Sequence, residues 1–111
     1  MPYVQQWPET AQQRQLLRGG DSRRALDRAT TALLLSEAAL NGVPGTCEEF
    51  VNCDLQNLTR EQMQAILGIE HLVEPDLYDR MADAVNTTAA RLDDADDLMA
   101  IALERQQAMC N

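Results

Sequence analysis

The apolar residues of this chain recur with the spacing of α-helices. From 75 to 109 they are separated by alternating steps of three and four residues, the pattern of a helix with one dry seam. The large apolar residues of that seam are Met81, Val85, Leu92, Met99 and Met109. At 1.5 Å per residue, a single helix over this range measures about 50 Å.

Such a helix is longer than a compact domain of this chain's size is wide, because its radius of gyration should be about 13 Å. Either the helix breaks near 86–88, or it overhangs the domain and packs against a partner helix. We favour the partner. The five seam residues are therefore the expected interface of a homodimer.

Four further helices are predicted before this one, at 10–17, 22–40, 47–52 and 60–73. Three of them follow a Thr with Gln or Glu three residues later, the spacing of a capping box; these are Thr10, Thr46 and Thr59. Gly42 and Pro44 should end the second helix, and Pro75 suits the first turn of the last one.

Composition supports an all-α fold. Aromatic residues make up only 4% of the 111 residues, whereas Ala and Leu, which favour helices, are abundant. At this length one domain is the expected number. We therefore expect residues 1–111 to form a single small bundle of four to five helices with a long C-terminal helix, preceded by an N-terminal arm at 1–9.

Two groups of apolar residues are candidates for binding a partner. In the arm, Tyr3, Val4 and Trp7 precede any helix; they either tuck onto their own domain or dock on another chain. In the helix at 22–40, Leu34 and Leu35 widen the apolar stripe. That helix is either central in the fold or covered by a partner.

Charge is distributed unevenly along the chain. Residues 1–40 carry five Arg against four acids, a net charge of +1, and residues 41–111 carry four Arg against fourteen acids, a net charge of −10, so the total of −9 arises in the second part. An acidic body disfavours direct nucleic-acid binding. The sequence has no apolar run long enough for a membrane span and no secretion signal. We expect a cytoplasmic protein in which Cys47, Cys53 and Cys110 are reduced thiols.

Two residue clusters resemble metal sites only superficially. The run Asp93–Asp97 satisfies the D-D-x-x-D pattern with which prenyl-transferring enzymes hold magnesium diphosphate, but a chain this short has no room for the deep cavity that this chemistry needs. Cys47, Cys53 and His71 lack the spacing of a zinc site and a fourth ligand. We expect no catalytic residues, no metal and no cofactor.

One stretch is similar to a known family. Residues 17–36 contain Gly-x-x-x-x-x-Ala-Leu-x-x-Ala followed by an Ala/Leu/Ser helix, and residues 65–74 resemble the second helix of the same proteins. The pattern resembles small all-helical regulators of pseudomonads, in particular QslA-type quorum-sensing anti-activators. The resemblance implies a helical dimer that binds a LuxR-type acyl-homoserine-lactone receptor and blocks its activation of transcription.

The sequence thus favours a non-enzymatic anti-activator whose partner is a transcription factor or another protein. A secretion chaperone or a toxin-immunity protein shares the small size and the acidity and is the first alternative. A magnesium-dependent enzyme that uses the Asp93–Asp97 cluster is the second.

Overall fold

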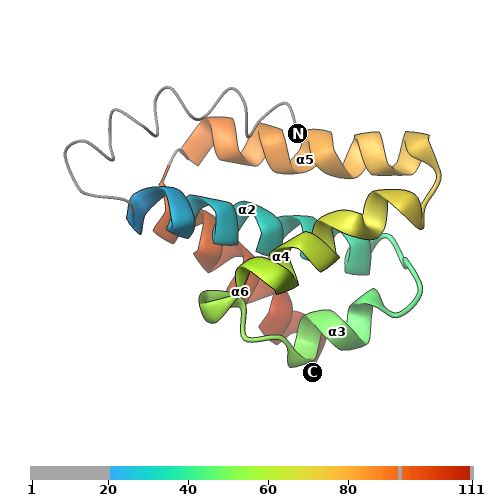
Figure 1. Ribbon diagram of the computed structural model, residues 1–111, viewed down its shortest axis with the longest axis horizontal. Coiled ribbons are helices and arrows are strands. Elements are labelled where there is room, and N and C mark those ends of the chain that lie inside the picture. Colours follow the sequence, from blue (N-terminus) through green and yellow to red (C-terminus); the bar gives the residue numbers. More distant parts are fainter. Residues whose placement is uncertain (1–20, 93, 111) are drawn as a thin grey trace.

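The computed structural model describes residues 21–92 and 94–110, and in these residues the chain is all-α (Figure 1). The expected bundle without strands is confirmed for this part of the chain. The predicted helix at 10–17 and the arm at 1–9 lie outside the described residues. In chain order the elements are α2 (Asp21–Leu40), α3 (Thr46–Asn52), the 3-10 turn η1 (Leu55–Asn57), α4 (Arg60–Leu67), the 3-10 turn η2 (Gly68–His71), α5 (Pro75–Leu92) and α6 (Ala95–Cys110).

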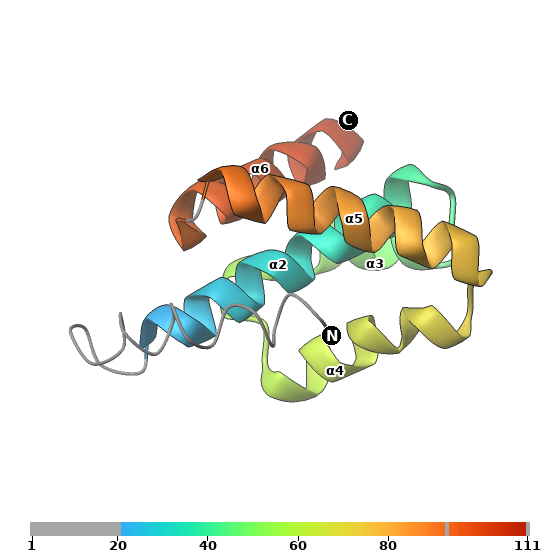
Figure 2. The same ribbon diagram turned by 90° about the horizontal axis from the view of Figure 1, so that it is seen from above.

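Helix α2 is the centre of the molecule. It packs against α3, α4, α5 and α6, which surround it in Figures 1 and 2. Eight successive residues, from Ala29 to Ser36, are at most 3% exposed. Because eight residues make more than two turns, the helix is buried on every side there. Of the two possibilities for Leu34 and Leu35, the central position is therefore the one this fold adopts.

The end of α2 follows from the residues beyond it. Gly42 adopts a left-handed conformation, with φ of 73°. Its N–H donates to the Ala39 carbonyl at 3.2 Å, and the Val43 N–H donates to the Ala38 carbonyl at 3.0 Å. These two bonds form a Schellman motif, which satisfies the carbonyls that the helix end leaves free. The predicted stop at Gly42 is confirmed.

The predicted single helix over 75–109 is wrong. Helix α5 ends at Leu92, α6 begins at Ala95, and the two helices fold back on each other in Figure 2. Asp94 caps α6: its Oδ1 accepts from the Asp96 N–H at 2.9 Å, and its carbonyl accepts from the Leu98 N–H at 3.0 Å. An Asp at this position satisfies an otherwise unpaired N–H, and the acids in the first turn favour the helix dipole.

The chain does not break at 86–88 either. The Thr88 hydroxyl donates to the Ala84 carbonyl at 2.9 Å, within a continuous helical turn. With 18 residues, α5 is about 27 Å long at 1.5 Å per residue. Helices of this length lie alongside α2, so no overhanging helix remains to require a partner.

The starts of α3 and α4 test the capping boxes predicted at Thr46 and Thr59. Thr59 and Gln62 form the expected reciprocal pair at the start of α4, with both bonds present. The box at Thr46 is wrong: Gly45 takes the N-cap position with φ of 81°, and the Thr46 hydroxyl instead donates to the Val43 carbonyl at 2.6 Å. Helix α4 also ends at Leu67, before the predicted end at 73, because the chain tightens into η2.

Two polar side chains of α6 tie it to the rest of the core. The Arg105 guanidinium lies 2.7 Å from the Glu37 carboxylate and donates to the Ser36 hydroxyl at 2.8 Å, both on α2. The Gln106 amide donates to the Phe50 carbonyl at 2.8 Å and to the Cys53 carbonyl at 2.7 Å, at the end of α3. Helix α6 is thereby fixed to two elements at once.

Candidate functional site

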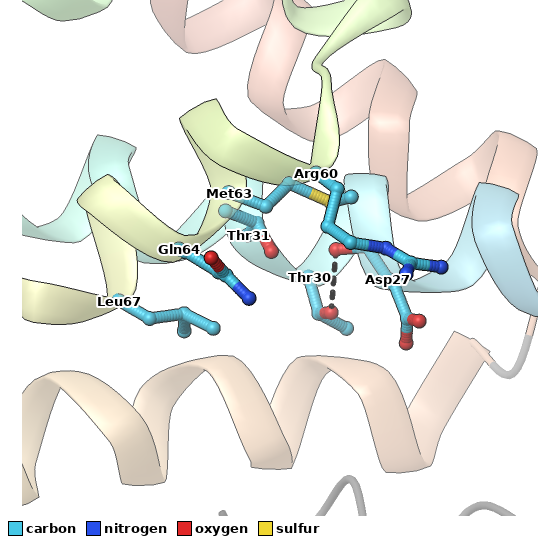
Figure 3. Close-up of a pocket in the computed structure, with 7 residues that line it drawn as sticks. All are labelled: Asp27, Thr30, Thr31, Arg60, Met63, Gln64 and Leu67. Atoms are coloured by element: carbon cyan, nitrogen blue, oxygen red, sulfur yellow. Dashed lines mark hydrogen bonds between the residues drawn. The ribbon is translucent and has the colours of Figure 1, made fainter.

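A groove between α2 and α4 is a candidate binding site that two helices line with apolar, polar and charged side chains. The groove is open to solvent on one side and has a volume of about 360 Å³, at the lower end of the range for ligand pockets. Figure 3 shows α2 as its floor, α4 as one wall and α5 on the opposite side. We call it the α2–α4 groove; it is lined by Asp27, Thr30 and Thr31 of α2 and by Arg60, Met63, Gln64 and Leu67 of α4.

Helical spacing explains why these seven residues meet. Positions three and four residues apart share a helix face. The three α2 residues have that spacing, and so do the four α4 residues. The capping box at Thr59 sets where α4 begins and hence which of its faces is turned to α2. Met63 and Leu67 are partly buried against the core and also line the groove.

The groove carries both signs of charge. The Asp27 carboxylate and the Arg60 guanidinium come from different helices and lie at the same end of the groove in Figure 3. Burial raises the pKa of Asp27, and the nearby Arg23 partly offsets that shift by favouring the charged form. Burial removes part of the water around the Asp27 carboxylate. A group on a bound partner that donates a hydrogen bond to this carboxylate would compensate for that loss.

The side chains that line the groove are suited to binding a partner rather than to catalysis. Thr30 is 2% exposed, and its hydroxyl donates to the Leu26 carbonyl at 3.0 Å and to the Asp27 carbonyl at 3.1 Å, in its own helix. No histidine lines the groove, and the single His71 has a side chain that is 79% exposed, beside Glu70. The arrangement offers apolar contact, one carboxylate, one guanidinium and one amide, which suits recognition of an amphipathic segment.

The structure distributes the predicted dimer residues between the core and the surface. Met81 and Val85 are each 1% exposed and belong to the protomer's own core. A second copy cannot reach them in this fold. Met99 and Met109 are partly buried against the same core, whereas Leu92 is 37% exposed at the end of α5. Leu92 alone of the five is an exposed large apolar side chain.

Of the predicted partner-binding residues, the structure describes only Leu34 and Leu35. Leu34 and Leu35 are 1% and 0% exposed and are therefore inaccessible to a partner, because α2 is surrounded by the other helices. Tyr3, Val4 and Trp7 lie outside the described residues.

The described part of the acidic run, residues 94–97, forms the start of α6, and Asp93 lies outside the described residues. Asp94 is the cap of α6 described above, and Asp96 and Asp97 are exposed in the first turn of that helix. Within residues 21–92 and 94–110, no group of three or more His, Cys, Asp or Glu side chains is arranged to hold a metal ion. Cys47 and Cys53 are free thiols, as expected. Cys110 has no described side chain.

The groove residues were missed by sequence reasoning. The spacing of 60, 63, 64 and 67 is visible in the sequence, but it predicts only that these positions share a face. Whether that face leaves space beside α2 depends on how α4 lies against α2. The relative placement of these two helices has no signal in the sequence.

Comparison with known proteins adds no identification. The chain matches no protein-family model, and no curated protein or solved structure was found to be similar to it. None of the described helices is both long enough and apolar enough to cross a membrane.

Proposed function

We propose that this protein is a non-enzymatic, protein-binding regulator that holds an amphipathic segment of its partner in the α2–α4 groove. The observation that supports this most directly is the groove itself, in which Met63 and Leu67 lie beside the opposite charges of Asp27 and Arg60. An apolar strip with charges at one end selects a helix that presents both kinds of residue on one face.

The finer proposal is that the partner is a LuxR-type transcription factor and that binding prevents it from activating transcription in the cytoplasm. Two observations support it. The stretch that resembles QslA-type anti-activators, residues 17–36, contains all three floor residues of the groove. The net charge of −9 disfavours competition for DNA and favours inhibition by contact with the activator.

A homodimer is part of this proposal, with a smaller surface than the sequence predicted. Leu92 supports it, because it is large, apolar and 37% exposed where α5 ends. Met81 and Val85 take no part, since they are inside the protomer.

The test is a reporter assay in a heterologous bacterium that contains a LuxR-type receptor, its lactone and its target promoter. Coexpression of the wild-type chain should lower reporter output, and the purified chain should retain the purified receptor on a column. Leu67→Glu places a charge in the groove and should abolish both effects. Leu72→Glu is the matched control, because Leu72 is 79% exposed and outside the groove.

Two results would contradict the proposal. If Leu67→Glu stays folded by circular dichroism and still inhibits as well as the wild type, the groove is not the binding surface. If the wild type neither binds the receptor nor lowers the reporter, the assignment to LuxR-type receptors is wrong. A rise in melting temperature on adding magnesium would instead favour the enzyme alternative.

A further inference from the structure

The end of α2 carries the single Asn-Gly pair of the chain, Asn41–Gly42, and both residues are exposed. Asn is among the thermally labile residues of proteins. The backbone nitrogen of the residue that follows an Asn can attack the carbon of its side-chain amide. Gly favours this attack because it has no Cβ beside the attacking nitrogen. The pair therefore has the chemistry for spontaneous deamidation.

The reaction at this pair has two steps. First, the Gly42 nitrogen bonds to Asn41 Cγ, and ammonia leaves with the amide nitrogen and with the proton that the Gly42 nitrogen gives up. The product is a five-membered cyclic imide. Water then adds and breaks one of the two ring C–N bonds, which leaves either aspartate or isoaspartate at position 41. No co-reactant other than water is needed.

The fold holds both reacting groups away from this path. The Gly42 N–H donates to the Ala39 carbonyl at 3.2 Å, so the attacking nitrogen is already engaged. The Asn41 Nδ2 donates to the Glu37 carbonyl at 2.7 Å. That bond turns the side-chain amide back along α2, whereas the attacking nitrogen belongs to the next residue in the chain. The bond from the Val43 N–H then closes the Schellman motif around Gly42.

The product does not fit the place of the amide. A carboxylate at position 41 has no hydrogen to donate, and it would face the Glu37 carbonyl oxygen. It would also put a negative charge at the C-terminal end of α2, where the helix dipole disfavours it. Isoaspartate adds one carbon to the backbone within the Schellman motif. The Glu37 carboxylate pairs with Arg105 of α6 at 2.7 Å, so the change lies beside a contact that fixes α6.

We propose that Asn41–Gly42 is a site of non-enzymatic deamidation, and that the folded end of α2 suppresses the reaction. A molecule reacts only while this helix end is open, and the product cannot form the same cap again. The deamidated fraction therefore records how often the end of α2 opens. Neither the α2–α4 groove nor a receptor takes part, so failure of the proposed function leaves this site unaffected.

The expected protection follows from the number of bonds that must open. Three hydrogen bonds hold Asn41, Gly42 and Val43 in place. Each bond of this kind lowers the open fraction about fivefold, so the three together lower it about a hundredfold. Because only open molecules react, the rate of deamidation falls by the same factor.

The test compares the folded chain, the chain in urea, and a synthetic peptide of residues 37–46, all in the same neutral buffer. Peptide mass spectrometry follows conversion at Asn41. The peptide and the chain in urea should convert at similar rates, and the folded chain about a hundredfold more slowly. Asn52 is the internal control: it is exposed and donates its amide to the Glu48 carbonyl at 2.9 Å, but Cys53 follows it. It should convert much more slowly than Asn41 in urea.

Val43→Ala tests whether opening of the helix end controls the reaction. Val43 is 6% exposed, and its truncation weakens the helix end without changing the two reacting residues. Conversion at Asn41 in the folded variant should be about tenfold faster than in the wild type, whereas the same change in the peptide should have no effect. Asn41→Asp carries one of the two products and should unfold at a lower urea concentration than the wild type.

Each of four results would overturn the proposal. Asn41 that stays intact in the peptide and in urea is not a site of deamidation. A folded chain that reacts as fast as the peptide is not protected by its fold. A folded Val43→Ala chain that reacts at the wild-type rate shows that opening of this helix end is not required. An Asn41→Asp chain as stable as the wild type shows that the product still forms the cap. If Val43→Ala does not fold, the comparison of the wild-type chain with the peptide still decides.

Discussion

Replacing Gln106 by Met should destabilise the fold. This is the opposite of what the apolar spacing of α6 suggests, because Met would fill a polar position in that spacing with an apolar side chain. Gln106 lies where α6 passes the end of α3, and its amide donates to the Phe50 carbonyl at 2.8 Å and to the Cys53 carbonyl at 2.7 Å. The last carbonyls of a helix have no N–H four residues later within that helix, and the Phe50 carbonyl also accepts from the Cys53 N–H at 3.4 Å. Met has nearly the same length and fills the same space, so Gln106→Met removes the two bonds without opening a cavity.

The size of the effect follows from the number of bonds. A hydrogen bond of this kind contributes about 1 kcal/mol net, so loss of two should lower the free energy of unfolding by about 2 kcal/mol. For a domain of this size, that corresponds to a melting temperature lower by roughly 8 °C. Urea unfolding followed by circular dichroism measures the free energy, with Gln107→Met as control. Gln107 is exposed on the same helix, and its replacement should change stability by less than about 0.5 kcal/mol.

Gln106→Glu adds a pH-dependent test of the same geometry. At neutral pH the introduced carboxylate would face two carbonyl oxygens, so this variant should be less stable than Gln106→Met. The charged form is disfavoured, and the folded-state pKa of the introduced group is raised above about 4.3. The difference in free energy of unfolding between Gln106→Glu and Gln106→Met should therefore shrink as pH falls through that pKa, and it should return as pH rises. If Gln106→Met instead matches the wild type, these bonds do not stabilise the protein and α6 is held by apolar contact alone.

Three further outcomes are expected. Asp94→Ala should cost about 1 kcal/mol in urea unfolding through loss of the α6 cap, and Asp94→Asn should cost clearly less; equal losses would contradict the capping role. Leu92→Asp should convert the proposed dimer to a folded monomer in light scattering, and a persistent dimer would exclude this surface. Burial raises the pKa of the Cys53 thiol, so near pH 8 iodoacetamide should alkylate it more slowly than the exposed Cys47; peptide mass spectrometry measures both rates.

Two helix ends that are set by residues close in sequence were predicted correctly. The stop of α2 at Gly42 and the capping box at Thr59 follow from backbone conformation and from bonds over three or four residues. The same kind of rule applies at Asp94, which is followed by two further acids and caps α6, but the prediction of one long helix rested on the apolar seam alone. A seam continues across a helical hairpin when both arms pack on one central helix.

The sequence by itself determined that the described part of this protein is helical, where α2, α3, α4 and α5 begin, and which residues are apolar enough to be buried. Only the tertiary structure decided what covers those residues. Leu34 and Leu35 are buried because α2 is central, and Met81 and Val85 are buried because α5 folds back beside it. The spacing of apolar residues shows which face of a helix is buried, but it does not show which other element packs against that face. The α2–α4 groove likewise depends on how α4 lies against α2, a relation between two elements that no local pattern records.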